Sequence, residues 1–355
     1  MLLFFPVHTL KKDKPFMPHK ALSFLKRKYG LFIWRHYLPC TVLCRNPLVL
    51  ATFDQEFLTN TPAFLDAFVK SRAKSIHVFL QLGWEHETPK NALPFAEKVK
   101  AAMEQCPRLK VTTLANSSNE VRVLTGLGLD CILCNHNALV DERRYPIIKS
   151  EKKYDALYIA RITPFKRHLL AKQISSLHLI GEISYRDSEQ EYNDYILHDQ
   201  LKHATWTRHV NGKDIPAAIA EARCGLCLSQ AEGGMFASVE YLLCGIPVVN
   251  TKNLGGRDEL FPDFAVKTVP DTPEAVAEAV HDFAEHAPDP ERIRAATLEK
   301  MKPHREAFRS LLNAAMKPKK FPESRRFPHK LLLRCTKTPL ALFRYGLRRC
   351  KTLGA

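Results

Sequence analysis

The chain has 355 residues, of which 45% are hydrophobic and 25% are charged, and its formal net charge is +16. This length accommodates two domains with complete hydrophobic cores, and the composition is ordinary for a globular protein. No apolar run approaches the roughly 20 residues that a membrane-spanning helix needs. The apolar run 1–7 is too short for a secretory signal and its lysines follow it, so we expect a cytoplasmic protein.

The positive charge is concentrated at the two ends of the chain. Residues 317–355 hold twelve lysines and arginines against Glu323, and residues 1–36 hold eight against Asp13. The body between these ends is therefore slightly acidic. An enzyme that binds nucleic acid more often carries basic charge on its folded body, so no nucleic-acid partner is expected.

Short apolar runs alternate with longer helical segments along most of the chain. In the first half the expected strands and helices are 47–53, 61–71, 75–81, 91–105, 109–113, 117–126 and 129–133. In the second half the expected strands are 154–160, 177–183, 205–210, 224–229, 247–252 and 265–269. The expected helices there are 167–175, 189–200, 213–222, 236–244, 272–286 and 289–316, the last with a kink at Pro303.

This alternation is typical of an α/β protein with parallel sheets that helices cover on both faces. The polar segment 135–150 is expected to be a linker. The predicted organisation is an amino-terminal domain over 1–150, a second domain over 151–316 and a basic tail over 317–355.

Two pairs of cysteines have the C-x-x-C spacing of zinc ligands: Cys131/Cys134 and Cys224/Cys227. Each pair lies in an apolar run that is expected to be a strand. Residues i and i+3 of a strand point to opposite faces, so one metal ion could not reach both sulfurs. Buried free cysteines in a reducing compartment are therefore favoured over a zinc site.

The stretch 229–240 carries the strongest local signal. A short apolar run ends at Ser229, Gly233 and Gly234 follow in a turn, and a helix is expected from about Phe236. The glycines allow a tight turn and a close approach of the backbone to a ligand. A helix that begins beyond the carboxyl end of a parallel strand directs free N–H groups and partial positive charge there, so an anion is the expected ligand.

Two carboxylates, Glu232 and Glu240, flank the start of that helix. Carboxylates do not bind phosphate, so hydroxyl groups are their expected partners. A sugar or a ribose next to a diphosphate would satisfy both the acids and the anion site. Taken alone, this loose spacing would favour a helix-capping acid and an ordinary surface glutamate.

A second anionic signal follows the first strand of the second half, where Arg161 and Lys166 lie in one loop. Open α/β sheets bind ligands at the carboxyl ends of their strands. A planar guanidinium and a point-charge ammonium together suit a diphosphate. The alternative is a pair of surface cations at a helix entry.

Four motifs follow one another across the second half: Arg161-x4-Lys166, Glu232-x7-Glu240, Pro247-Val-Val249 and Gly255-Gly256. Their order resembles the retaining glycosyltransferases of GT-B fold in family 4, which move a sugar from a nucleotide donor. The resemblance extends from Ala115 to about Phe283. It implies two Rossmann-like doubly wound domains, and Asn135-His-Asn137 stands where the family has Pro-Asn-Gly before its linker.

The resemblance implies a role for each matching residue. Arg161 and Lys166 would hold the donor diphosphate and stabilise its charge as it leaves. Glu232 would contact hydroxyls of the donor sugar, and Glu240 the ribose. Further donor contacts are expected from Gly233, Gly234, Met235, Phe236 and, next to the base, Val210.

The sequence contains no D-x-D, the usual metal-binding signature of the other major transferase fold. We therefore expect no metal and no cofactor, with cationic side chains and helix N–H groups stabilising the leaving diphosphate. In the first domain His86 is the candidate catalytic residue because it follows an expected strand. A surface loop histidine is the alternative.

The basic tail suggests a partner. A helix over 339–350 would place Leu340, Phe343 and Leu347 on one face, with arginines beside them. That pattern is typical of helices that bind anionic membrane surfaces, and a disordered basic tail is the alternative.

The predicted function is transfer of a sugar to a glycan or lipid-linked acceptor at the inner face of the cytoplasmic membrane, in synthesis of an envelope polysaccharide or lipopolysaccharide. An epimerase or phosphorylase of the same fold stays open, because fold alone does not separate these activities. A basic binding protein with a decayed active site is the non-enzymatic alternative.

Overall fold

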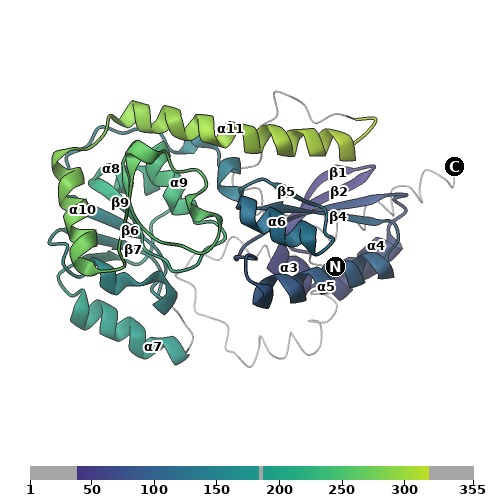
Figure 1. The fold of residues 1–355 in the computed structure, drawn as a ribbon, viewed down its shortest axis with the longest axis horizontal. Helices are drawn as coiled ribbons and strands as arrows, with labels where there is room; N and C mark the ends of the chain where they lie inside the picture. Colours follow the sequence, from purple (N-terminus) through teal and green to yellow (C-terminus); the bar gives the residue numbers. More distant parts are fainter. Residues whose placement is uncertain (1–37, 184–186, 320–355) are drawn as a thin grey trace, which may run out of the picture.

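The computed structural model describes residues 38–183 and 187–319. Two β-sheets lie side by side with helices around them, and the last helix of the described residues passes along both (Figure 1). Residues 1–37 and 320–355, which hold most of the basic charge of the two ends and the helix expected over 339–350, lie outside the described residues.

The first sheet has five strands in the order β1-β2-β3-β4-β5. Its strands are β1 (Thr41–Arg45), β2 (Leu48–Phe53), β3 (Ile76–Gln81), β4 (Leu109–Ala115) and β5 (Cys131–Leu133). All neighbours are parallel except β1, which pairs antiparallel with β2 at the edge. The helices between these strands are α3 (Asp54–Thr59), α4 (Thr61–Lys70), α5 (Pro89–Gln105) and α6 (Ser118–Gly126).

Successive residues of β2 enter different hydrophobic clusters, as the period of two requires. Leu48 and Leu50 pack with α3, α4, α5 and α6 on one face of the sheet. Val49 and Ala51 pack on the other face, against the end of helix α11 (Pro290–Ala315). The second face of the first sheet is therefore covered by the last described helix of the chain.

The second sheet has six parallel strands in the order β11-β10-β9-β6-β7-β8. They are β6 (Tyr154–Ile159), β7 (Leu177–Ile180), β8 (Thr205–Thr207), β9 (Ala222–Cys227), β10 (Val248–Thr251) and β11 (Val266–Val269). The order reverses between β6 and β9, the first and fourth strands of this sheet. In doubly wound sheets this switch point leaves a crevice at the carboxyl ends of the strands, where ligands bind.

Most of the helices of the second half lie where the pattern predicts them. They are α7 (Asp187–Asp194), α8 (Ile215–Ala220), α9 (Phe236–Leu243), α10 (Pro273–Glu285) and α11. No α-helix forms over 167–175, where one was expected. This part of the chain has two short 3-10 turns, Pro164–Lys166 and His168–Ala171. Arg167 between them has a φ of 52°, in the left-handed region, so the two turns cannot join into one α-helix.

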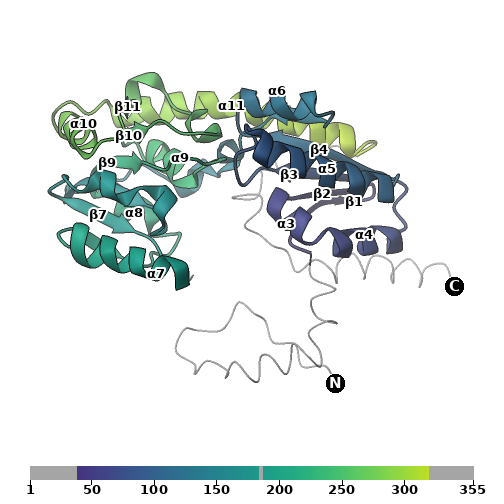
Figure 2. The ribbon, with the colours of Figure 1, turned by 60° about the horizontal axis from the view of Figure 1, so that its bottom comes forward.

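Helix α11 continues through Pro303 and links the two sheets. Both views show it passing from the second sheet to the first (Figures 1 and 2). Ile293 and Met301 enter the core of the second half, whereas Phe308 and Leu312 enter that of the first. The predicted second domain, 151–316, thus contains a segment that packs on the first sheet.

Eight cysteines within the described residues are buried, and none of them forms a disulfide. Burial raises the pKa of the Cys131, Cys134 and Cys227 thiols to about 12. Cys131 and Cys227 lie in strands and Cys134 directly follows β5, and all three behave as small apolar core residues. Among the helices that the structure describes, none is both long and apolar enough to cross a membrane.

Candidate functional site

A cleft of about 850 Å³ lies at the carboxyl ends of the strands of the second sheet, with the first domain on its other side. The loops after β6, β7, β8 and β9 line it, together with the first turns of α9. The first domain contributes Gln55, Gly83 and Trp84. The cleft therefore lies at the switch point between β6 and β9, where the topology places a ligand.

Eight of the ten residues predicted for the site line this cleft: Arg161, Lys166, Val210, Glu232, Gly234, Met235, Phe236 and Glu240. They come from three segments of the chain: the loop after β6, the loop after β8 and the stretch 232–240. Gly233 and His86 are outside the lining. The structure thus brings the two cations and the two acids of the predicted site together in one cleft, while their roles stay predictions.

Glu232 and Lys166 form an ion pair across the cleft floor, with side chains that are 9% and 12% exposed. The hydroxyl of Ser229 donates to the same Oε1 of Glu232 at 2.6 Å. The backbone N–H of Glu232 donates to the carbonyl of Leu254 at 2.9 Å. Both the backbone and the side chain of Glu232 are therefore held in place.

Hydrogen bonds from neighbouring residues hold the backbone of the loop that carries Lys166. The buried hydroxyl of Tyr158, in β6, donates to the carbonyl of Lys166 at 2.6 Å. Burial, and then the charge of Glu232, raise the pKa of Tyr158 far above its usual value, so this phenol stays protonated and remains a donor. The next residue, Arg167, donates from Nε to the carbonyl of Leu228 at 2.6 Å. Lys166 thus extends from an anchored backbone into the cleft.

Glu240 faces the cleft from α9 although the residue is only 4% exposed. The hydroxyl of Tyr145, in the segment between the two sheets, donates to its Oε1 at 2.8 Å. Burial is the main cause, and the charge of Glu240 the next, of a raised pKa at Tyr145. Tyr145 therefore donates at all physiological pH values and orients the carboxylate.

The start of α9 has no side chain capping it, since Met235 at the N-cap accepts no hydrogen bond through its side chain. Phe236 and Ala237, in its first turn, line the cleft. The first N–H groups of a helix have no partner within the helix, and its dipole is positive at this end. This end of the cleft therefore favours an anion.

The two glycines before α9 are required by contacts with the first domain. A Cβ at Gly233 would lie 2.7 Å from the carbonyl oxygen of Trp84, and a Cβ at Gly234 would overlap the ring of His136. Gly233 thus serves the approach of the two domains rather than the wall of the cleft. The sequence predicted a close backbone approach here, but to a ligand.

His86 lies in the loop after β3 and is buried, with its Nε2 3.5 Å from Oδ2 of Asp54. Its ring packs edge-on against Phe95, with the centroids 4.6 Å apart. Its backbone N–H donates to Glu120, whose pKa burial raises to about 7. The structure therefore presents a different residue of the same loop, Trp84, to the cleft.

Trp84 meets Phe165 of the second domain edge-to-face, with ring centroids 5.4 Å apart. Both rings line the cleft. This pair was not predicted from the sequence, because an aromatic residue in a loop has no periodic signal. Their positions in the sequence could have indicated them, since each of the two residues follows the carboxyl end of a parallel strand.

Asparagines join the two domains behind the cleft. Asn135 donates from Nδ2 to the carbonyls of Asn116, at 2.8 Å, and Gly256, at 2.6 Å. Asn137 donates to the carbonyl of Met235 at 3.1 Å. The Asn135-His-Asn137 segment therefore ties the first domain to both glycine-containing turns of the second.

No group of three or more histidine, cysteine, aspartate or glutamate side chains in 38–183 or 187–319 is arranged to hold a metal ion. Each of the three acids of the cleft lining already has a partner: Glu232 pairs with Lys166, Glu240 with Tyr145 and Glu182 with Arg208. Arg161, Lys166 and Arg208 are cations of the cleft lining, and Arg161 and Lys166 are the pair in the loop after β6 that was predicted to hold a diphosphate.

Residues 141–300 match the family model described as glycosyl transferases group 1. This span is somewhat under half of the chain and covers the second sheet with its site loops. No curated protein matches the sequence.

Solved structures resemble the chain over about three quarters of its length. The Anabaena protein Alr3699/HepE, in complex with UDP, shares 17% identity with a TM-score of 0.51, covering 75% of this chain and 76% of its own. Sucrose-phosphate synthase from Thermosynechococcus elongatus shares 15% identity with a TM-score of 0.52, covering 72% and 75%. A glycosyltransferase from Rickettsia africae ESF-5 shares 14% identity with a TM-score of 0.53, covering 75% and 83%. The likeness confirms the GT-B fold that the sequence motifs predict.

Proposed function

We propose that this chain, a GT-B protein whose residues 141–300 match the group 1 glycosyl transferases, moves a sugar from a nucleotide donor to a glycan or lipid-linked acceptor. The observation that carries the proposal is the single cleft that gathers Arg161, Lys166, Glu232 and Glu240 at the switch point of the second sheet. The UDP bound by the Anabaena protein of the same fold supports a nucleotide donor.

The diphosphate of the donor would lie against Arg161, Lys166 and the first turn of α9. When the bond between sugar and phosphate breaks, negative charge develops on the departing diphosphate. Cations and helix N–H groups already in place stabilise that charge without reorganising during the reaction. This arrangement does for the leaving group what a divalent metal does in other transferases, so we propose a metal-independent reaction.

The two acids would bind the hydroxyls on either side of the diphosphate. Glu232 would accept from the donor sugar, and Glu240, near the buried wall of the cleft, from the ribose. The loop that follows β8, with Val210, would border the base. The acceptor would enter from the first domain, past Gln55 and Trp84, because these residues form the opposite wall.

We also place the enzyme at the inner face of the cytoplasmic membrane, acting on an envelope glycan. The charge of residues 317–355 supports a contact with anionic lipid. The eight cysteines of the described residues are buried and form no disulfide, which fits a reducing compartment.

Lys166→Ala tests the proposal. The variant removes one of two cations from the diphosphate site, and hydrogen bonds to charged groups contribute about 1.5 to 3 kcal/mol each. We expect the wild-type chain to bind one member of a panel of nucleoside diphosphates and nucleotide sugars, and Lys166→Ala to bind it at least about tenfold more weakly. Isothermal titration calorimetry measures both affinities.

Lys172→Ala is the matched control, because Lys172 is an exposed lysine outside the cleft lining. It should bind as the wild type does. Failure of the wild-type chain to bind any member of the panel would contradict the proposal. Epimerised sugar appearing without an acceptor would redirect it to the same-fold epimerases.

A further inference from the structure

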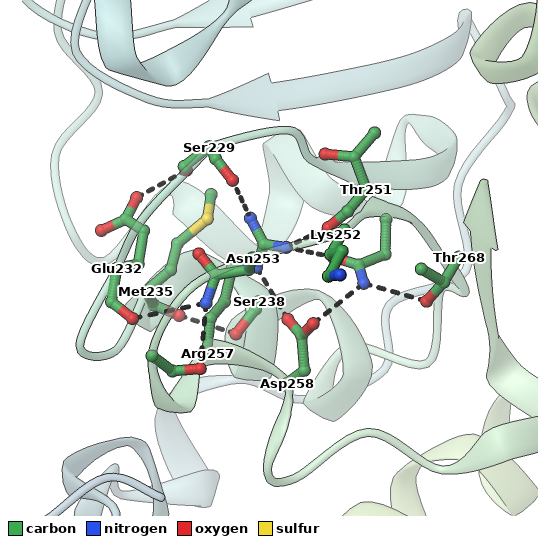
Figure 3. A network of polar contacts seen from close by, with 12 residues as sticks. Ser229, Glu232, Met235, Ser238, Thr251, Lys252, Asn253, Arg257, Asp258 and Thr268 are labelled. Atoms are coloured by element: carbon green, nitrogen blue, oxygen red, sulfur yellow. Dashed lines mark hydrogen bonds and ion pairs between the residues drawn. The ribbon is translucent and has the colours of Figure 1, made fainter. Parts of the chain in front are cut away.

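Arg257 is a fully buried arginine in the turn that follows Gly255 and Gly256. Its Nη1 donates to the carbonyl of Ser229 at 2.8 Å. Its Nη2 donates to Oδ1 of Asn250 at 2.7 Å and to the carbonyl of Thr251 at 2.5 Å. Figure 3 shows the guanidinium at the centre of these contacts.

Burying a charged guanidinium costs free energy, and a residue that only fills space in the core would not need this charge. Its charge is balanced by one carboxylate, Asp258, which accepts from Nε at 2.8 Å and is itself partly exposed. Apolar side chains of similar volume often stabilise a core as well as or better than a buried ion pair. The contacts of Arg257 therefore point to a role other than filling space.

The guanidinium reaches the cleft through one intermediate residue. Ser229 accepts from Arg257 at its carbonyl and donates from its hydroxyl to Oε1 of Glu232. A second guanidinium, that of Arg167, donates from Nη2 to the same carbonyl of Ser229 at 3.3 Å. The backbone of Ser229 is thus held from two sides, and its hydroxyl extends from this restrained backbone to Glu232.

This support matters most when a donor is bound. In the structure Glu232 has two side-chain partners, Lys166 and Ser229. If Lys166 turns to a diphosphate, Ser229 remains to orient the carboxylate. The orientation of Glu232 toward a sugar hydroxyl then depends on what holds Ser229.

We propose that Arg257 is a positioning residue that acts through Ser229 to hold Glu232 against the donor sugar. The inference rests on the proposed function, since it takes the ligand of Glu232 to be a sugar hydroxyl. It separates two parts of donor recognition. The diphosphate is bound without Arg257, whereas the sugar is recognised only when Arg257 is in place.

Arg257→Lys is the test, because lysine keeps the charge but cannot reproduce the planar fork that joins Ser229, Asn250 and Thr251. UDP and UDP-glucose serve as probes in calorimetry. We expect the affinity for UDP to change less than about twofold and the affinity for UDP-glucose to fall about tenfold, which is the loss of one charged hydrogen bond. An equal fall for both probes would overturn the proposal.

Two further variants separate positioning from general stability. Arg108→Lys is the matched control, since Arg108 also donates to backbone carbonyls, at 2.7 Å to Ala73 and 2.8 Å to Phe68, but in the first domain. It should leave both affinities unchanged. Combined with Glu232→Gln, Arg257→Lys should weaken UDP-glucose binding no further than Glu232→Gln alone, because both act on one contact. Additive losses would refute the link.

A crystal structure of the unliganded Arg257→Lys variant decides the matter independently of the donor. The hydroxyl of Ser229 should lie beyond hydrogen-bonding distance of Glu232 while the sheet is unchanged. If that hydrogen bond is retained, the proposal is wrong whatever the chain binds. If instead the wild type binds neither probe, the proposed function fails for a UDP donor, and this structure still tests the positioning. Arg257→Met, which fills the space without a charge, replaces the lysine variant should that one not fold.

Discussion

At the scale of single residues, each acid of the cleft has a partner that sets its direction. Glu232 is held by Ser229 and Lys166, and Glu240 by Tyr145. A carboxylate that accepts one fixed hydrogen bond keeps lone pairs for another donor. Both acids are therefore oriented for hydroxyl groups while their own positions are maintained by the protein.

Glu240→Gln should remove the preference for a ribose with its hydroxyls. The measurement compares the nucleoside diphosphate that binds best with its 2′,3′-dideoxy analogue. We expect the wild type to prefer the ribose form about tenfold and the variant to prefer it less than about twofold, since the charged acceptor is lost.

The control for this change is Glu278→Gln, an exposed residue of α10 outside the cleft lining. It should keep the wild-type preference. A Glu240→Gln variant that still discriminates tenfold would show that another group binds the ribose.

At the scale of elements, the sequence pattern predicted the strands of the second sheet as short apolar runs between helical segments. Strands β7 and β10 are buried along their whole length, as parallel strands covered on both faces are, and each of the six strands was expected within a few residues of its bounds. Strand β1 and helix α3 were missed, because β1 is an edge strand that pairs antiparallel and α3 is only six residues long.

The site residues that could be predicted from the sequence are charged residues that follow the expected strands. Arg161, Lys166 and Glu232 lie in loops that follow expected strands, and Glu240 lies in the helix that follows one of these loops. A parallel sheet brings the carboxyl ends of its strands to one edge. Arg257 was not predictable in this way. Its side chain turns inward from a surface-like Gly-Gly-Arg-Asp sequence, and only the three-dimensional contacts with β10 reveal that it is buried.

The turn before α9 provides a prediction at this scale. Gly234→Ala places a Cβ in the ring of His136 and so forces the turn away from the first domain. Displacing site groups by about 1 Å can cost roughly a hundredfold in function. We expect the affinity for the nucleotide sugar that binds best to fall at least about tenfold, as measured by calorimetry.

Gly126→Ala is the matched control, because a Cβ there would meet nothing within 4 Å at the end of α6. Alanine is the better helix former by up to about 1 kcal/mol, so this variant should bind normally and unfold at an equal or higher temperature. Wild-type affinity in Gly234→Ala would mean that the two domains do not need their close approach for donor binding.

At the scale of the whole molecule, α11 joins the two halves into one unit. Its first half is part of the core of the second sheet and its end covers the open face of the first. The asparagines behind the cleft add a second connection between the halves. The cleft is thus bounded by two domains whose separation is set at two places. The path of α11 was not evident from sequence, because its apolar residues show a helix but not which sheet it covers.

The end of α11 also defines how the basic tail can be removed. Phe308, Leu312 and Met316 pack on the first sheet, so a chain that ends at Lys319 keeps the whole helix and its contacts. The segment 320–355 that it loses carries ten lysines and arginines and one acidic residue. The shortened chain therefore tests the tail without disturbing the fold.

We expect the full chain to sediment with vesicles that contain phosphatidylglycerol and the chain ending at Lys319 to lose most of this binding. Each basic residue near an anionic surface contributes about 1 kcal/mol, so binding by the full chain should weaken steeply as salt is raised. Vesicles of phosphatidylcholine alone should bind neither chain. Both chains should bind the nucleotide sugar equally, because the cleft lies in residues 55–240. Equal sedimentation of the two chains with anionic vesicles would exclude the tail as the membrane contact and assign it to the basic residues of 1–36 or to the folded body.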